Sequence, residues 1–206
     1  MTSPPALLHD TYYHIFSRGV NRENIFIEER NYEYFLRLYA KYIEPVTETF
    51  AYCLLRNHFH LLVKIKMEEE IQSLRVSKTL RDSEKRVYTP SQQFSNFLNA
   101  YAKAINKRHE RTGSLFQHPF GRVMVTTNSH LLRAVTYIHQ NPQRHGFVDD
   151  FRDWPYSSYH ALTRPGKTRL QRVDVLDWFG GEAGLVSAHE IRVDEKFALE
   201  FAPDDD

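Results

Sequence analysis

The sequence has a single cysteine, no long apolar run and almost no net charge. Cys53 cannot form a disulfide within the chain and falls in an apolar run, which is typical of an inert core residue. No segment approaches the roughly 18–20 consecutive apolar residues that cross a bilayer. The first residues, from Met1 to Pro5, lack the basic and apolar pattern of a secretory signal. We therefore expect a cytoplasmic protein with no membrane partner.

The charged residues are unevenly distributed along the chain. The 206 residues include 27 Lys and Arg and 26 Asp and Glu. Residues 1–148 hold 20 basic and 13 acidic residues, whereas residues 149–206 hold 7 and 13. A basic body is typical of proteins that bind a polyanion such as nucleic acid, although an ordinary solvated surface can have this composition. We expect residues 1–148 to form the functional domain.

Hydrophobic periodicity predicts an α+β fold. Strands are expected at residues 11–17, 49–55, 58–65 and 122–126, and helices at 29–43 and from Thr89 to about 111. A further helix begins at a Ser129 cap, and its end is marked by Asn141-Pro142 and by Gly146. Residues 68–86 are expected to form a polar connection. The order β-α-β-β-α-β, followed by a helix, predicts a ferredoxin-like (RRM-like) antiparallel sheet with helices on one face.

The aromatic residues after Asp149 predict a C-terminal helical accessory segment, residues 149–206, that packs on the body. They are Trp154, Tyr156, Tyr159, Trp178 and Phe179. The acidic end, from Ala202 to Asp206, is expected to fray, because short polar termini have few contacts that hold them.

Two histidines alternate on the third predicted strand, in Asn57-His58-Phe59-His60. Side chains at i and i+2 share one face of a strand, so His58 and His60 point the same way. Two imidazoles placed in this way can share a divalent metal ion. The same short pattern also arises from two half-exposed histidines on a sheet face.

A tyrosine and an asparagine are spaced by four in Tyr137-Ile138-His139-Gln140-Asn141-Pro142. On a helix they share one face, so a hydroxyl nucleophile and an amide ligand could serve one site. Alternatively, Tyr137 packs in the core and Asn141 ends the helix before the proline.

Together these motifs resemble the HUH-type single-tyrosine transposases, and among them the REP-associated tyrosine transposases. The stretches that carry the resemblance are Arg56–Val63, Gly113–Gln117 and Tyr137–Gly146, with Asp153–Tyr159 similar to the segment after the tyrosine helix. The resemblance covers approximately residues 10–163 and implies that residues 1–148 form an HUH single-tyrosine transposase domain on a ferredoxin-like sheet.

The resemblance also implies an activity and a set of site residues. Such enzymes use Mg²⁺ or Mn²⁺ to cleave and rejoin single-stranded DNA, usually beside a hairpin. His58 and His60 match the metal-binding histidines, and Tyr137 matches the nucleophile that forms a 5′-phosphotyrosine. Asn141 stands where many relatives carry Gln as the third ligand of one divalent ion, so the neighbouring Gln140 is an alternative ligand.

Cations near these motifs are candidates for DNA contact, because cations bind phosphate oxygens without reading base sequence. Each is equally compatible with a solvated surface charge. The candidates are Arg18, Arg22, Lys103, Lys107, Arg108, Arg111, Arg122 and Arg144.

Several alternatives stay open on the sequence alone. Tyr101 is a second potential nucleophile, but it lies on the apolar stripe of its helix. His139 and His145 could contact metal or phosphate, or be structural. The chain could be a non-catalytic, domesticated single-stranded nucleic-acid-binding module, or a phosphoesterase that uses water. Its partner would be single-stranded or hairpin DNA, and the spacing fits both a monomer and a homodimer.

Overall fold

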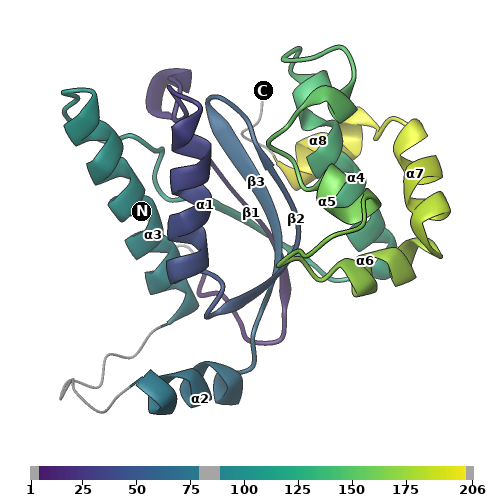
Figure 1. Ribbon diagram of the computed structural model, residues 1–206, viewed down its shortest axis with the longest axis horizontal. Helices are drawn as coiled ribbons and strands as arrows, with labels where there is room; N and C mark the ends of the chain where they lie inside the picture. Colours follow the sequence, from purple (N-terminus) through teal and green to yellow (C-terminus); the bar gives the residue numbers. More distant parts are fainter. Residues whose placement is uncertain (1–4, 79–88, 203–206) are drawn as a thin grey trace.

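The computed structural model describes residues 5–78 and 89–202 and is built on a four-stranded antiparallel sheet (Figure 1). The strands are β1 (Tyr12–Arg18), β2 (Thr47–Leu54), β3 (His58–Ile65) and β4 (Gly121–Val125). They lie side by side in the order β2-β3-β1-β4. Every neighbouring pair is antiparallel, which confirms the predicted ferredoxin-like α+β fold.

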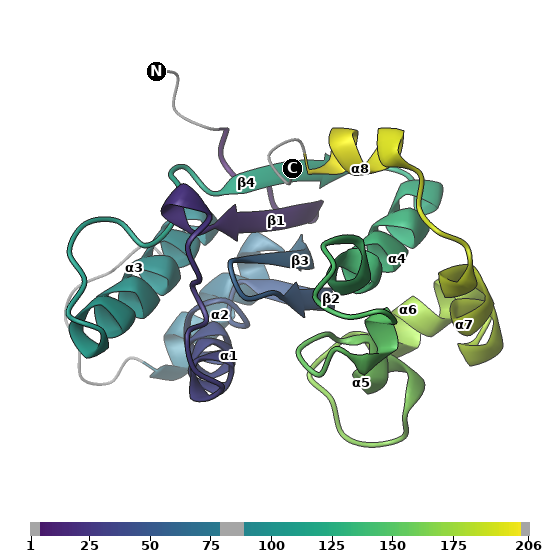
Figure 2. The same ribbon diagram turned by 90° about the horizontal axis from the view of Figure 1, so that it is seen from above.

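Two amphipathic helices, α1 (Arg30–Tyr42) and α3 (Pro90–Arg108), cover one face of the sheet (Figures 1 and 2). Their apolar stripes meet the sheet in one core cluster that includes Phe35, Phe59 and Phe97. Helix α3 begins as the sequence predicts, because the Thr89 side chain accepts a hydrogen bond from the Gln92 amide and caps the helix.

The opposite face of the sheet is covered by α4 (Asn128–Arg144) and by helices that follow it (Figure 2). These later elements are η2 (Phe151–Asp153), α5 (Tyr159–Thr163), α6 (Arg172–Phe179), α7 (Glu182–Glu190) and α8 (Glu195–Phe201). A second core cluster joins Leu62 and Val135 of the body to Trp154 and Phe201. The indole of Trp154 also donates to the Leu54 carbonyl at 2.9 Å. The division of the chain at residue 148 stays a prediction.

Helix α4 differs from the prediction at its N-terminus. Its N-cap is Thr127 rather than Ser129, since the Thr127 hydroxyl accepts from the His130 amide at 3.2 Å. Of the two end signals, Asn141-Pro142 does not stop the helix, which continues through Pro142 to Arg144 and ends just before Gly146. Proline removes one backbone hydrogen bond, but Pro142 is buried here, and packing of this helix face against the sheet offsets that loss.

Two further expectations are corrected. Residues 68–78 form helix α2 (Glu68–Lys78), in which Glu68 and Glu69 lie at the N-terminus, where acidic side chains stabilise a helix. The rest of that predicted connection is outside the described residues, as is the acidic end from residue 203. Ala202 does not fray, because its amide bonds to the Ala198 carbonyl and only 1% of its surface is exposed.

A short 3-10 turn, η1 (Val20–Arg22), follows β1 directly. Within residues 5–78 and 89–202, no helix has the length and apolar character that crossing a membrane requires.

Candidate functional site

Strand β3 places the two histidines of the His-x-His motif beneath α4. Their ring centroids lie 5.1 Å apart with the ring planes nearly perpendicular, at 88°. The residue between them, Phe59, belongs to the core on the opposite face, as strand alternation predicts. The register of β1 pairs His60 with Phe16 and His58 with Arg18. The histidines therefore share one face with a phenyl ring and a guanidinium from the neighbouring strand.

Helix α4 brings Tyr137 to the same place. The Tyr137 ring centroid lies 5.7 Å from that of His60 at an interplanar angle of 84°, and only 1% of the residue is exposed. Two turns further along the helix, the ring of His145 lies 4.8 Å from that of His58. Positions 137, 141 and 145 share one helix face. Asn141 therefore lies between Tyr137, which is beside His60, and His145, which is beside His58.

The amide of Asn141 has an open acceptor. Its Nδ2 donates to the Tyr137 carbonyl at 3.1 Å, and the side chain is fully buried. Its Oδ1 accepts no hydrogen bond from any residue of the described ranges. A buried amide oxygen without a donor is costly unless another group, such as a cation, binds it.

The alternative ligand, Gln140, is committed elsewhere. Its Nε2 donates to the carbonyls of His189 and Ile191 at 3.0 and 2.9 Å, and its Oε1 accepts from the Val193 amide at 3.0 Å. These contacts attach α4 to the connection between α7 and α8. Asn141 therefore fits the role of third ligand better than Gln140.

The hydrogen bonds of the two histidines fit a metal bound through Nε2. Nδ1 of His58 lies 2.7 Å from Oδ1 of Asn57, and Nδ1 of His60 lies 2.9 Å from Nε2 of His14. Metal-binding histidines usually bond through one ring nitrogen while an outer partner holds the other. No cluster of three His, Cys, Asp or Glu side chains forms a metal site in the part of the chain described. The orientation of the two histidines and the open amide oxygen of Asn141 fit a site with two imidazoles and one amide as ligands.

Helix α8 packs directly over the tyrosine. The ring centroids of Phe201 and Phe197 lie 5.4 and 6.3 Å from that of Tyr137. Two arginines of α4 contact the segment between α7 and α8. Arg144 donates to the Val193 carbonyl at 3.2 Å, and Arg133 pairs with Asp194. The phenol ring is therefore enclosed by the C-terminal helix, which lies across the end of α4 in Figure 2.

A pocket opens beside the histidines, at the end of the sheet where β1 finishes and β3 begins. It is lined by Phe16, Ser17, Arg18, His58, Phe59, His60, Gln117, Pro119 and Gly121. The Gln117 amide donates to the Arg18 carbonyl at 2.8 Å, which fixes the loop that forms one wall. Gly121 is required here, since a Cβ would lie 2.3 Å from the Phe16 ring. Arg18 is 8% exposed and lies within this pocket wall.

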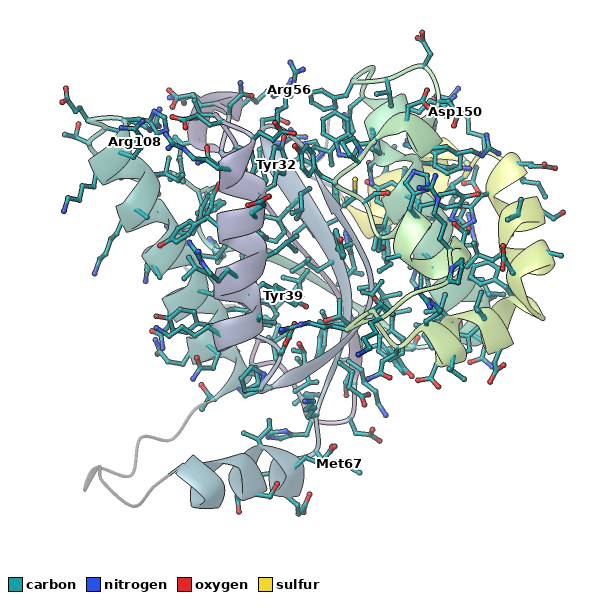
Figure 3. All side chains as sticks on the ribbon, viewed as in Figure 1. Tyr32, Tyr39, Arg56, Met67, Arg108 and Asp150 are labelled. Atoms are coloured by element: carbon teal, nitrogen blue, oxygen red, sulfur yellow. The ribbon has the colours of Figure 1, made fainter. Side chains whose placement is uncertain are left out.

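The predicted DNA-contacting cations differ in exposure. Arg22, Lys103, Lys107 and Arg108 are exposed, whereas Arg18 is buried. Several of the cations contact the protein itself: Nε of Arg108 lies 3.8 Å from Oε1 of Glu28, Arg111 pairs with Glu23, Arg122 donates to the Pro5 carbonyl, and Arg144 donates to the Val193 carbonyl. Figure 3 shows Arg108 and Arg56 at the same end of the molecule. Arg56 is exposed on the turn before His58 and was not among the sequence candidates.

Two other sequence candidates are structural. Tyr101 is fully buried and donates to the Ile25 carbonyl at 2.8 Å, and burial raises the pKa of its phenol. His139 lies 2.8 Å from His189 and 2.7 Å from the Ser158 hydroxyl, and burial lowers the pKa of His139 well below its ordinary value. Cys53 is a buried core residue.

The chain resembles known proteins in sequence and in fold. No protein-family model matches the chain. A "Putative REP-associated tyrosine transposase" of Haemophilus influenzae is 30% identical over 115 residues, which cover 55% of this chain and 59% of the relative. The chain is a homologue of that protein. It spans little more than half of the relative's length.

A solved structure gives the same fold. It is described as a REP-associated tyrosine transposase bound to a REP hairpin. It matches with a TM-score of 0.57 and 16% sequence identity, covering 78% of this chain and 84% of the other. The four-stranded antiparallel sheet and the C-terminal helices of this chain are consistent with that fold.

Proposed function

We propose that the chain cleaves and rejoins single-stranded DNA beside a hairpin, with Tyr137 as the nucleophile. One divalent ion, Mg²⁺ or Mn²⁺, would be held by His58, His60 and Asn141. The observation that carries the proposal is the juxtaposition of the Tyr137 ring with that of His60, 5.7 Å apart. Similarity to a "Putative REP-associated tyrosine transposase" supports a role for this tyrosine as the nucleophile.

The proposed reaction exchanges one phosphate ester for another. The Tyr137 oxygen loses its proton and bonds to phosphorus, and the bond from phosphorus to the 3′ oxygen breaks. That oxygen takes up a proton and leaves as a 3′-hydroxyl, so that a 5′-phosphotyrosine remains. A 3′-hydroxyl of another strand then reverses both steps. Because one ester replaces another, the cycle needs no ATP.

The two imidazole ligands of the proposed site favour Mn²⁺ over Mg²⁺. When bound, the ion supplies charge that offsets the negative charge developing on the phosphate oxygens. Imidazole is a poor ligand for Mg²⁺ and a better one for Mn²⁺, so we expect stronger activity with Mn²⁺. Asn57 and His14 would keep the rings of His58 and His60 oriented through their Nδ1 atoms.

The proposed DNA partner is a hairpin with a single-stranded flank. The structurally similar transposase is bound to a REP hairpin. In this chain, Arg22 follows β1 and Arg56 precedes β3, the two strands that line the pocket, and both cations are exposed. They would bind backbone phosphates, as would exposed Lys107 of α3. The scissile strand would enter the pocket beside His58. Helix α8 must move off Tyr137 before the phenol can reach that strand.

A second candidate is a hairpin-binding module without catalysis. The enclosure of Tyr137 beneath Phe197 and Phe201 favours it, because a buried phenol cannot attack DNA. Under this reading α8 stays closed and the protein binds DNA through its surface cations alone.

One experiment separates the two candidates. Labelled hairpin DNA with a single-stranded flank is incubated with the protein and Mn²⁺, and a denaturing gel shows any protein that carries label. We expect an adduct from the natural chain and from Tyr42→Phe, a matched variant on α1, and none from Tyr137→Phe. Hairpin affinity should be equal in all three. Retention of the adduct by Tyr137→Phe would refute the assignment, and hairpin binding without an adduct would favour the binding module.

A further inference from the structure

We propose that His14 is a positioning residue that holds His60 in the tautomer whose Nε2 lone pair faces a metal. Nothing in the sequence motifs assigns a role to His14. The inference rests on the proposed function, since it gives His60 a ligand's task, but the tautomer itself can be measured without metal.

The direction of the hydrogen bonds follows from a backbone carbonyl. Nδ1 of His14 lies 2.9 Å from the carbonyl oxygen of Phe201. A carbonyl oxygen can only accept, so Nδ1 of His14 must carry the proton and donate. A neutral imidazole has one donor and one acceptor nitrogen, which makes Nε2 of His14 the acceptor.

The same reasoning applies to the ring of His60. Nε2 of His14 lies 2.9 Å from Nδ1 of His60, so Nδ1 of His60 must donate its proton to His14. In neutral His60 the lone pair is then on Nε2. The chain from Phe201 through His14 to His60 therefore selects the ring nitrogen that a metal would bind.

Packing fixes the position of the His14 ring. It is fully buried and stacks on Phe201 with centroids 4.0 Å apart and on Phe16 at 4.9 Å. His14 is the β1 partner of Leu62, so its side chain lies diagonally across from His60 on the same sheet face. The ring cannot swing away without disturbing both neighbours.

The other candidate ligand receives an equivalent contact from a different source. Nδ1 of His58 faces Oδ1 of Asn57, an acceptor on the adjacent residue, at 2.7 Å. Asn57 is part of the motif on β3, whereas His14 comes from β1. Both rings thus have an acceptor at Nδ1, and the two acceptors are supplied independently.

The test measures histidine tautomers in the metal-free protein by ¹⁵N NMR. In the natural chain we expect His60 to carry its proton on Nδ1. His14→Leu removes the acceptor and should give a mixture of tautomers, whereas His14→Gln offers an amide oxygen and should retain the natural tautomer. Leu199→Ala is the matched control: it changes an exposed position on the same helix but keeps both the ring and the carbonyl of Phe201, so His60 should be unchanged.

Mn²⁺ titration supplies the second readout. Loss of an outer partner to a ligating histidine weakens metal binding about 10- to 100-fold, which is the effect expected for His14→Leu but not for His14→Gln. Natural protein whose His60 carries its proton on Nε2 would overturn the inference, even if His14→Leu failed to fold. Equal Mn²⁺ affinity in folded His14→Leu would also overturn it. If the natural chain binds no Mn²⁺, the proposed function fails, and the metal-free tautomers still decide the role of His14.

Discussion

The ring of Phe201 lies edge-on against that of Tyr137, with centroids 5.4 Å apart and an interplanar angle of 86°. The carbonyl of the same residue lies 2.9 Å from His14, so one residue at the end of α8 contacts both the proposed nucleophile and the partner of a proposed metal ligand. The sheet face and helix that carry His60 and Tyr137 therefore form one packed unit with the C-terminal helix, and access to Tyr137 depends on how firmly α8 is held.

Loosening α8 should increase adduct formation. Asp194 caps the helix by accepting from the Phe197 amide at 2.9 Å and also pairs with Arg133. Asp194→Ala removes both contacts and leaves the apolar packing intact, so α8 should open more often and adduct yield should rise severalfold. Hydrogen exchange of the α8 amides checks that the helix is looser. Faster exchange with no gain in adduct would contradict this role of α8.

The pocket residues should affect cleavage more than hairpin binding. Arg18 is paired with His58 across the strands and lines the pocket, so Arg18→Gln should lower the adduct rate at least about tenfold through loss of a charge-assisted phosphate contact. Hairpin affinity should change little. Lys41→Gln, on the far helix α1, is the control. An equal loss of cleavage in both variants would argue against a specific role for Arg18.

Gln117 should influence which base is accepted beside the cleaved bond. Its side chain is exposed at the pocket, while its backbone amide is bonded to Arg18. Gln117→Ala keeps that backbone contact and removes a side chain able to bond to base edges. Adduct rates on four oligonucleotides that differ at one flanking base should converge in the variant. Unchanged discrimination would place base recognition elsewhere.

Acid should destabilise the protein through a buried pair of imidazoles. Burial lowers the pKa of His139 well below its ordinary value and that of His189 to about 4. As the pH falls below about 6.5, the unfolded imidazoles take up protons that the folded ones cannot. The unfolded state then binds more protons, so the free energy of unfolding decreases as the pH is lowered. For His189 this loss continues toward pH 4.

His189→Gln tests this pH dependence, since glutamine retains hydrogen-bonding groups but does not titrate. Between pH 7 and pH 5, a histidine whose pKa falls from about 6.5 unfolded to about 4 folded, as for His189, contributes a loss of about 2 kcal/mol in the free energy of unfolding. Urea unfolding at both pH values should therefore show a smaller loss in the variant by about that amount. Parallel curves for the two proteins would show that His189 is not the group responsible.

The sequence predicts those strands and helices whose bounds are set by neighbouring residues. Strand β3 has the expected bounds, because alternation and the neighbouring turn mark both of its ends. The His-x-His spacing and the four-residue spacing after Tyr137 indicated shared faces, and these faces meet in the fold. The motifs did not show that His145 would lie beside His58, although it occupies the next turn of the same helix face.

The features that sequence reasoning missed depend on distant contacts. His14 and Phe201 are 187 positions apart, and no local pattern links a strand histidine to a carbonyl at the far end of the chain. The continuation of α4 through Pro142 likewise depends on burial against the sheet, which local propensity does not include. The contacts that commit Gln140 to the α7–α8 connection became visible only with that segment in place.

The most direct measurement is the identity of the residue that carries DNA. The tryptic peptide from Ala134 to Arg144 contains Tyr137 as its only tyrosine. After reaction with Mn²⁺ and hairpin DNA, followed by nuclease trimming, mass spectrometry should find this peptide with a nucleotide joined through a 5′-phosphate. We expect that modification on Tyr137; a modified peptide from another part of the chain would contradict the proposed role of Tyr137.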